Sequence, residues 1–244
     1  VALESKAGTA LDNSTVDISD TAANLVSAVG DAATFKDLDA QNSVTVSDTA
    51  TIDQAVTINA ALTKDMTAGS YTVNDTTANV LAAVSGGVGL GGEDTDVVTD
   101  AGTIQLTTAA TIANIKTIDG QAANAGTLGS GLGTDFTYTI SDAPATLNTA
   151  SAGGGDKAVL NAATSYTANA ALSLAEATQL IKDGNFDDVY SIEDTNSQFV
   201  VVKPAEDATL LTDAVTVTIS EDVGGVEADL TYVAYASVDA VVLT

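Results

Sequence analysis

The chain has 244 residues, with 33 Asp and Glu against 7 Lys and no Arg, so its formal charge is −26. It contains no His, Cys or Trp, which excludes disulfides, thiolate or imidazole metal sites, a Ser-His-Asp triad and a cysteine nucleophile. The scarcity of cations argues against nucleic-acid binding, whereas 45% hydrophobic residues indicate a folded chain rather than an acidic tail.

No enzymatic activity is expected. Paired carboxylates of the glycosidase kind are the one acid–base arrangement open to the chain, but no pair stands out among the 33 acids. No run of 18 apolar residues predicts a transmembrane helix. Residues 1–4 lack the basic and apolar regions of a signal peptide. We therefore expect a mature extracellular or cell-surface chain, or a segment of a longer one, without membrane insertion.

A short motif recurs along the chain: an apolar residue or Tyr, a polar residue, Val or Ile, a second polar residue and Asp. Its clear copies cover residues 16–20, 44–48, 71–75, 138–142 and 190–194, and weaker copies cover 97–100, 166–169 and 217–221. Six of the seven steps between copies are 24 to 28 residues long, and the long step contains a Gly-rich insertion at about 126–133. The spacing predicts a structural repeat of about 27 residues.

Each copy alternates with period 2, which predicts a short strand with Val, Ile or Tyr on one face. Short helices are expected next, at 21–26, 52–60, 76–81 and 174–181, where Ser173 and Glu176 form a capping-box pattern. An Asp between strand and helix is well placed as an N-cap, because its carboxylate accepts unpaired amide hydrogens. The predicted caps are Asp20, Asp48, Asp75, Asp100, Asp142 and Asp194.

These elements predict an α/β repeat fold, a solenoid-like stack of short parallel strands and short helices, with a mainly β solenoid or sandwich as the alternative. The strand–helix repeats are expected over residues 1–185. Residues 186–244 are expected to form a β-rich cap or assembly region, with strands at 198–202, 215–220, 227–235 and 237–243. An open solenoid end must be capped or paired.

The last strand is a candidate for donation to a neighbouring molecule by strand addition. It comprises Ala240, Val241, Val242, Leu243 and Thr244. The alternative is that it pairs within its own chain.

Calcium is the one metal ion that this composition suits, because Ca²⁺ takes oxygen ligands from carboxylates and carbonyls. The stretch 86–96 loosely resembles a Gly-Gly-x-Gly-x-Asp calcium repeat, and its candidate ligands are Glu93, Asp94 and Asp96. The stretch occurs once and its glycines are out of phase with that repeat. A loop with solvated acids is the alternative.

Thr occupies the middle of several predicted strands, on the face opposite to Val, Ile and Tyr, at Thr45, Thr72, Thr139, Thr167 and Thr218. Thr is a good strand former on a solvated face, which is the plain interpretation. Stacked in a solenoid, these residues would form a row of hydroxyls and methyls. Such a row is the basis for a more distant hypothesis, an ice- or mineral-binding surface.

Residues 18–25 and 44–55 resemble the repeats of very large secreted bacterial proteins, found in cyanobacteria and aquatic proteobacteria and described as surface, adhesin-like or S-layer-like. This resemblance implies an extracellular structural role, and it assigns no functional residue.

Our leading hypothesis is therefore an extracellular structural protein, the self-assembling subunit of a filament, sheath or surface layer. It would act as a homo-oligomer or polymer. The alternative is a calcium-dependent adhesin or binding module, with a cell-surface glycan as a candidate partner.

Overall fold

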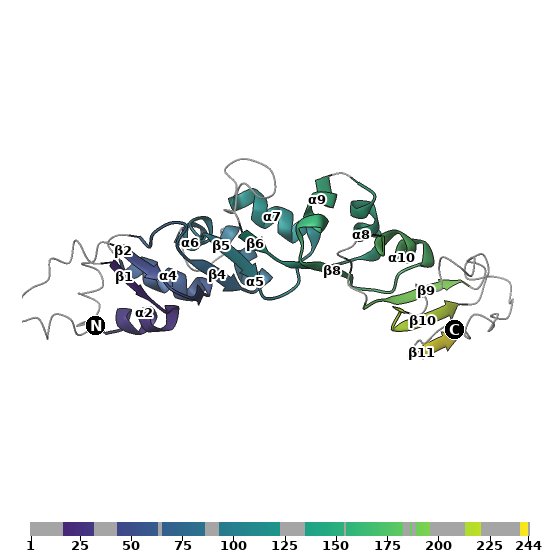
Figure 1. Cartoon of the computed structure of the whole chain (residues 1–244), viewed down its shortest axis with the longest axis horizontal. Coiled ribbons are helices and arrows are strands. Elements are labelled where there is room, and N and C mark those ends of the chain that lie inside the picture. Colours follow the sequence, from purple (N-terminus) through teal and green to yellow (C-terminus); the bar gives the residue numbers. More distant parts are fainter. Residues whose placement is uncertain are drawn as a thin grey trace, which may run out of the picture. The chain divides into compact units, whose positions relative to one another are not determined.

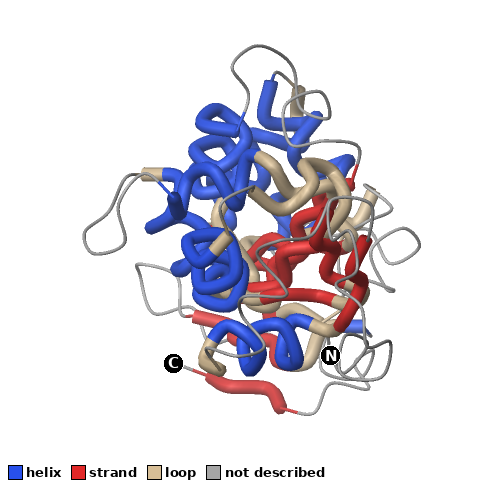
Figure 2. The backbone as a smooth tube through the Cα atoms, turned by 90° about the vertical axis from the view of Figure 1, so that its left-hand side faces the viewer, coloured by secondary structure: helices blue, strands red, loops and turns tan. Residues whose placement is uncertain are grey.

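The computed structural model describes residues 17–31, 43–62, 65–85, 93–122, 135–153, 155–182, 186, 189–195, 213–220 and 240–243. Short strands and short helices alternate along these residues (Figures 1 and 2), and every strand pair among them is parallel. The predicted mixed α/β class is thus confirmed, and the mainly β alternative does not hold. No helix in the described part of the chain is long and apolar enough to cross a membrane.

The chain forms two compact units. Unit 1 comprises Val1–Ala109 and Ala113–Tyr138, and unit 2 comprises Ala110–Ile112 and Thr139–Thr244. The division predicted between residues 185 and 186 falls inside unit 2.

Unit 1 holds a two-stranded sheet, β1-β2, and a four-stranded sheet in the order β3-β4-β5-β6. Its strands are β1 (Asp17–Asp20), β2 (Ser43–Val46), β3 (Thr49–Ala50), β4 (Thr72–Asp75), β5 (Thr103–Leu106) and β6 (Asp135–Thr137). Its helices are α2 (Ala22–Val29), α4 (Ile52–Ala61), α5 (Thr77–Val84), α6 (Glu93–Thr99) and, apart from its first residue, α7 (Ile112–Ala122). Strands that are neighbours in a sheet are also consecutive along the chain, so each sheet is built from successive repeats.

Unit 2 holds a two-stranded sheet, β7-β8, and a three-stranded sheet in the order β11-β10-β9. Its strands are β7 (Thr139–Asp142), β8 (Ser165–Ala168), β9 (Ser191–Thr195), β10 (Thr216–Ser220) and β11 (Ala240–Leu243). Its helices are α8 (Pro144–Ser151), α9 (Gly155–Ala162) and α10 (Leu174–Leu180), which lie together on one side of β8 in Figure 1.

The core is built mainly from aliphatic side chains, as the period-2 and helical patterns predict. Alternate strand residues are buried, such as Val44 and Val46 in β2 and Val73 in β4, and helices add residues such as Ile58. Each Val or Ile that leaves water contributes about 1.5–3 kcal/mol. In unit 2 a small aromatic cluster adds to the aliphatic core, where Phe186 contacts both Tyr166 and Tyr190.

One predicted strand is wrong. Residues 97–100 lie at the end of α6 and just beyond it, and the strand of this repeat is β5. The consecutive residues Val97 and Val98 are both buried. A half-buried strand points successive side chains to opposite faces, so it would bury only one of them. The predicted strands at 198–202 and 227–235 lie outside the described residues.

The predicted Thr row is not continuous. Thr45 lies opposite Ser19, and Thr139 lies opposite Ser165. A shorter row does occur in unit 1, where Thr72 pairs with both Thr49 and Thr103. Strand register, which the motif does not determine, decides which residues become neighbours.

Candidate functional site

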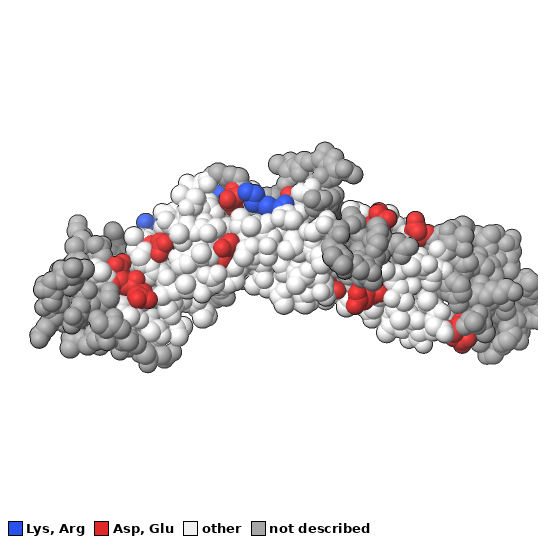
Figure 3. Space-filling view, turned by 180° about the vertical axis from the view of Figure 1, so that it is seen from behind, with Lys and Arg blue, Asp and Glu red and all other residues white. Residues whose placement is uncertain are grey.

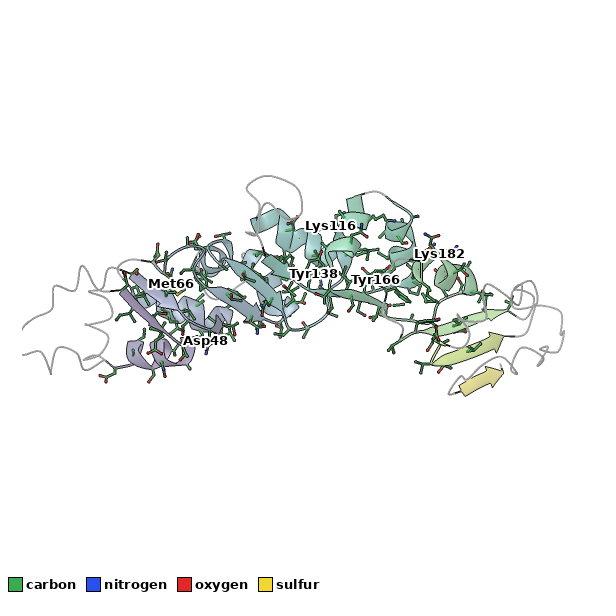
Figure 4. The ribbon with its side chains drawn as sticks, in the orientation of Figure 1. Asp48, Met66, Lys116, Tyr138, Tyr166 and Lys182 are labelled. Carbon is green, nitrogen blue, oxygen red and sulfur yellow. The ribbon has the colours of Figure 1, made fainter. Side chains whose placement is uncertain are left out.

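The repeats are joined by one recurring hydrogen bond. The first amide of a helix donates to a side-chain oxygen of the next repeat, and we call the accepting residue the junction residue. There are five such pairs in the described residues: Ala22 N to Asp48 Oδ1 (2.8 Å), Ile52 N to Asp75 Oδ2 (2.9 Å), Thr77 N to Thr108 Oγ1 (3.0 Å), Ile112 N to Asp142 Oδ2 (3.0 Å) and Leu174 N to Asp194 Oδ2 (3.0 Å). Figure 4 shows Asp48 beside α2, the helix whose first amide it accepts. Each bond satisfies a helix N–H that has no partner inside its helix.

Three of these carboxylates also hold their own repeat. The Oδ1 atoms of Asp75, Asp142 and Asp194 accept the amide of the following residue at 2.7, 2.8 and 2.8 Å. Asp75 Oδ1 accepts Asn79 Nδ2 as well, at 2.8 Å. One oxygen therefore binds its own repeat and the other binds the preceding one, so each of these carboxylates is a bridge between neighbours.

The predicted role of these residues as N-caps needs correction. The N-cap is a different residue, Thr21 in α2, Thr51 in α4, Thr76 in α5 and Ser173 in α10, and its hydroxyl accepts the amide three residues on. The period-2 strand explains the difference, because Asp75 lies on the same buried face as Val73, toward the helices. Its carboxylate reaches the helix of the preceding repeat rather than its own.

The capping-box pattern in the sequence correctly indicates where helices begin. The box predicted at Ser173 and Glu176 is present in α10. A second box, at Thr51 and Gln54 in α4, has the same pattern and was not singled out from the sequence.

Asp100 is not a junction residue. It follows α6, and its carbonyl accepts the amide of Gly69 at 2.7 Å. The position that corresponds to a junction in that repeat is held by Thr108, which also accepts the hydroxyl of Thr77 at its carbonyl oxygen. The motif search missed Thr108 because the residue there is not Asp. Thr108 lies at nearly equal distances along the sequence from Asp75 and Asp142, and this spacing would have identified it.

The repeat that starts at β7 lacks this bond for a chemical reason. α8 begins at Pro144, which has no amide hydrogen to donate. Continuing the register Asp142↔Ala168 by two residues places Ala170 opposite Pro144. The one described helix that lacks the donor therefore faces a residue that lacks the acceptor. This match supports the view that the other junction residues have a side-chain oxygen because they accept this hydrogen bond.

The repeats are of two alternating kinds. Helices α2, α5 and α8 start two residues after Asp20, Asp75 and Asp142, respectively, whereas α4, α7 and α10 start four residues after Asp48, Thr108 and Ala170. The two extra residues belong to the sheet, since they form β3 or the isolated bridges of Ala110 and Leu172. In this second kind of repeat the chain therefore pairs first with the preceding strand and then with the following one.

Asp20 and the junction residue Asp48 do not lie opposite each other, an arrangement in which their carboxylates would repel. Strand register pairs Asp20 with Val46 rather than with Asp48. On the face that Figure 3 shows, acidic side chains form small separate groups, one of which lies beside Lys side chains.

The calcium candidates Glu93, Asp94 and Asp96 lie in α6. The side chains of Glu93 and Asp94 are outside the described part, and the described residues contain no group of three or more carboxylates arranged to hold a metal ion. The Asp96 carbonyl accepts the Asp100 amide at 2.8 Å, as part of the helix. The calcium hypothesis stays a prediction.

Three carboxyl groups among the described residues have shifted pKa values, and burial raises that of Asp119. Hydrogen bonds from Asn24 and then from the Thr21 amide lower the pKa of Asp20. Burial raises the pKa of Asp100, and the neighbouring charges of Asp96 and Asp65 raise it further.

The candidate assembly strand, Ala240, Val241, Val242, Leu243 and Thr244, is described over its first four residues. These form β11, which pairs in parallel with β10 of the same chain. Among the described residues, β11 has no strand on its other side.

In comparisons with protein-family models, with curated proteins and with solved structures, nothing matched this chain.

Proposed function

We propose that this chain is an extracellular structural protein, a self-assembling subunit of a filament, sheath or surface layer, built as a solenoid-like stack of strand–helix repeats. The observation that carries the proposal is the junction hydrogen bond. Through this bond the first helix amide of one repeat depends on the next repeat for its acceptor, in addition to the backbone pairing of parallel strands.

A repeat of this kind has two different sides. One side offers a helix amide and a strand edge, and the other offers a junction oxygen and the opposite strand edge. A contact between unlike sides is heterologous, so adding further repeats continues the stack instead of closing it. This is the geometry expected of a growing polymer.

The first and last described strands support the same proposal. β1 pairs only with β2, and β11 pairs only with β10, within the described residues. Unpaired strand edges are sites at which another chain can add a strand.

Negative-stain electron microscopy and sedimentation velocity of the purified chain test the proposal. We expect elongated polymers whose amount rises with protein concentration and with NaCl, because salt screens the repulsion between subunits of charge −26. A chain that stays monomeric at all concentrations and ionic strengths would contradict it.

A matched variant ends after residue 239 and so lacks β11. It is expected to remain folded, by circular dichroism, and to form shorter assemblies. Polymers of unchanged length would show that β11 plays no part in assembly.

A further inference from the structure

Helix α8 begins without the two contacts that fix the starts of four other helices. In α2, α4, α5 and α10, a hydroxyl N-cap accepts an amide of the first turn. The first amide of each of these helices also donates to a junction residue. In α8 the N-cap is Ala143, whose side chain makes no capping bond, and Pro144 has no amide to donate. Neither contact is therefore available to α8.

A buried polar atom of α8 also lacks a partner. Asn148 Oδ1 is buried and accepts no hydrogen bond within the described residues. An acceptor that leaves water without finding a donor costs free energy in the packed state, and this cost is recovered when the helix opens to water. The packed form of α8 is thus disfavoured at a second point, independent of the start of the helix.

The contacts that hold α8 lie further along it. Leu147 is fully buried, and the Ser151 carbonyl accepts Lys157 Nζ of α9 at 3.0 Å. The Ser151 hydroxyl accepts Gln179 Nε2 of α10 at 3.4 Å, which is long for a hydrogen bond. α8 is therefore held at its middle and its C-terminal end, so opening begins at its first turn.

The start of α8 depends on its own chain rather than on a neighbouring repeat. The ring of Pro144 fixes φ near the helical value and so favours the first turn. The strands beneath are paired independently of the helix, since β7 and β8 are in register and the Asn169 amide donates to the Asp142 carbonyl at 2.9 Å. α8 can therefore open and re-form without breaking a junction bond to the repeat that contains β8 and α10.

We propose that α8 is a helix that opens locally, ahead of α2, α4, α5 and α10, while the β7–β8 pair stays in place. An eight-residue helix is unstable by itself in water, so the open segment is unfolded and Leu147 is exposed to solvent. Opening of any of the other four helices breaks a bond to the next repeat, which couples them to their neighbours. The chain thus has one repeat that yields first to heat or denaturant, and this inference does not depend on self-assembly.

Hydrogen exchange of the full chain, followed by mass spectrometry, measures this opening. When closing is faster than exchange, the protection of an amide reports the equilibrium between the closed and open helix. We expect amides 147–151 of α8 to be about a hundredfold less protected than amides 177–180 of α10, since each of two missing hydrogen bonds contributes roughly a factor of ten. Equal protection of the two helices would overturn the proposal.

Two substitutions together supply the missing junction bond. Pro144→Ala restores an amide, and Ala170→Asp places an acceptor opposite it. The double variant should raise the protection of α8 about tenfold, and neither single substitution should do so. Asp48→Ala is the matched control in the reverse direction, because it removes the acceptor of Ala22 N in α2 and keeps the Thr21 cap. It should lower protection in α2 about tenfold and leave α8 unchanged.

Thermal melts and circular dichroism establish that each variant is folded. Unchanged protection of α8 in a folded double variant would show that the missing bond is not the cause of the opening. Loss of protection in β8 and α10 at the same rate as in α8 would show that the opening is not local, which also overturns the proposal. If a variant does not fold, the comparison of α8 with α2 and α10 in the unaltered chain still decides the proposal.

Discussion

At the scale of single residues, the junction carboxylates combine two tasks that are usually separate. Asp75 is 7% exposed, and its two oxygens accept three hydrogen bonds from two repeats. Hydrogen bonds to a charged group contribute about 1.5–3 kcal/mol each, and a buried donor left without its partner is costly. Loss of such a residue should therefore affect both repeats.

Replacing Asp75 with Ala is expected to lower the free energy of unfolding by about 2–4 kcal/mol, since Ile52 N, Thr76 N and Asn79 Nδ2 all lose their acceptor. Urea denaturation measures the change. Asp53→Ala removes the same charge from an exposed site in the first turn of α4 and should cost at most about 1 kcal/mol, the usual contribution of an acidic residue at a helix N-terminus. Equal effects of the two substitutions would contradict the bridging role.

The ionised carboxylate of Asp100 lowers the stability of the folded chain, and this effect depends on pH. Burial, Asp96 and Asp65 raise its pKa in the folded chain, so the folded state binds the proton more tightly than the unfolded state, whose pKa is about 3.9. Stability is therefore lost as pH rises from that value through the raised pKa, and the penalty is fully present above it.

We accordingly expect Asp100→Asn to raise the melting temperature at pH 7 and to leave it nearly unchanged at pH 3, where both states are protonated. Melts of the two proteins across this range are the measurement, with Asp53→Asn as the control for removal of a charge. A gain that is the same at both pH values would show that the Asp100 charge is not the cause.

At the scale of elements, a helix start and a strand end in the next repeat form one structural feature. Extending the β7–β8 register places Ala170 opposite Pro144, and this combination suggests that donor and acceptor are required together. Changing only one of them leaves a polar group facing an apolar one, whereas changing both creates a junction.

A double-mutant cycle tests this pairing. Pro144→Ala and Ala170→Asp are each expected to be neutral or destabilising, by up to about 1 kcal/mol. Together they should recover about 1–2 kcal/mol beyond the sum of the single effects, the contribution of one new charge-assisted bond. Additive effects in urea denaturation would argue against a junction at this position.

At the scale of the whole molecule, charge opposes compactness. Because 33 acids outnumber 7 Lys, the excess negative charges repel one another. The range of this repulsion depends on salt, since the screening length falls from about 30 Å at 0.01 M to about 3 Å at 1 M. Helix amides neutralise some carboxylates locally through the junction bonds, but the net charge remains.

Stability should therefore rise with simple salts. We expect the melting temperature to increase by several degrees between 0.01 and 0.5 M NaCl, and equally in KCl, because screening does not distinguish these cations. The same titration at pH 3.5, where part of the negative charge is neutralised, should have a smaller effect. A melting temperature that is independent of salt at pH 7 would contradict this account.

Much of the local structure was predictable from the sequence. Alternation of Val, Ile or Tyr with polar residues predicted strands such as β2, β4 and β7, and the box at Ser173 and Glu176 predicted the start of α10. These patterns are local, because side chains alternate along a strand and helix caps involve residues three apart. The strand predicted at 97–100 failed because local Val content alone does not distinguish a strand from a buried helix end.

The partners of the junction residues were decided only by the tertiary structure. A shift of two residues in strand register leaves the same side chains on the buried face, so the hydrophobic pattern does not distinguish the two registers. The equivalent Asp residues of the motif, Asp20 and Asp48, would face each other in one of these registers. The observed register differs from it by two residues, and places Asp20 opposite Val46 and Asp48 opposite the first residue of α2. The sequence by itself thus determined which residues face the helices, while the pairing of strands determined which helix each carboxylate binds.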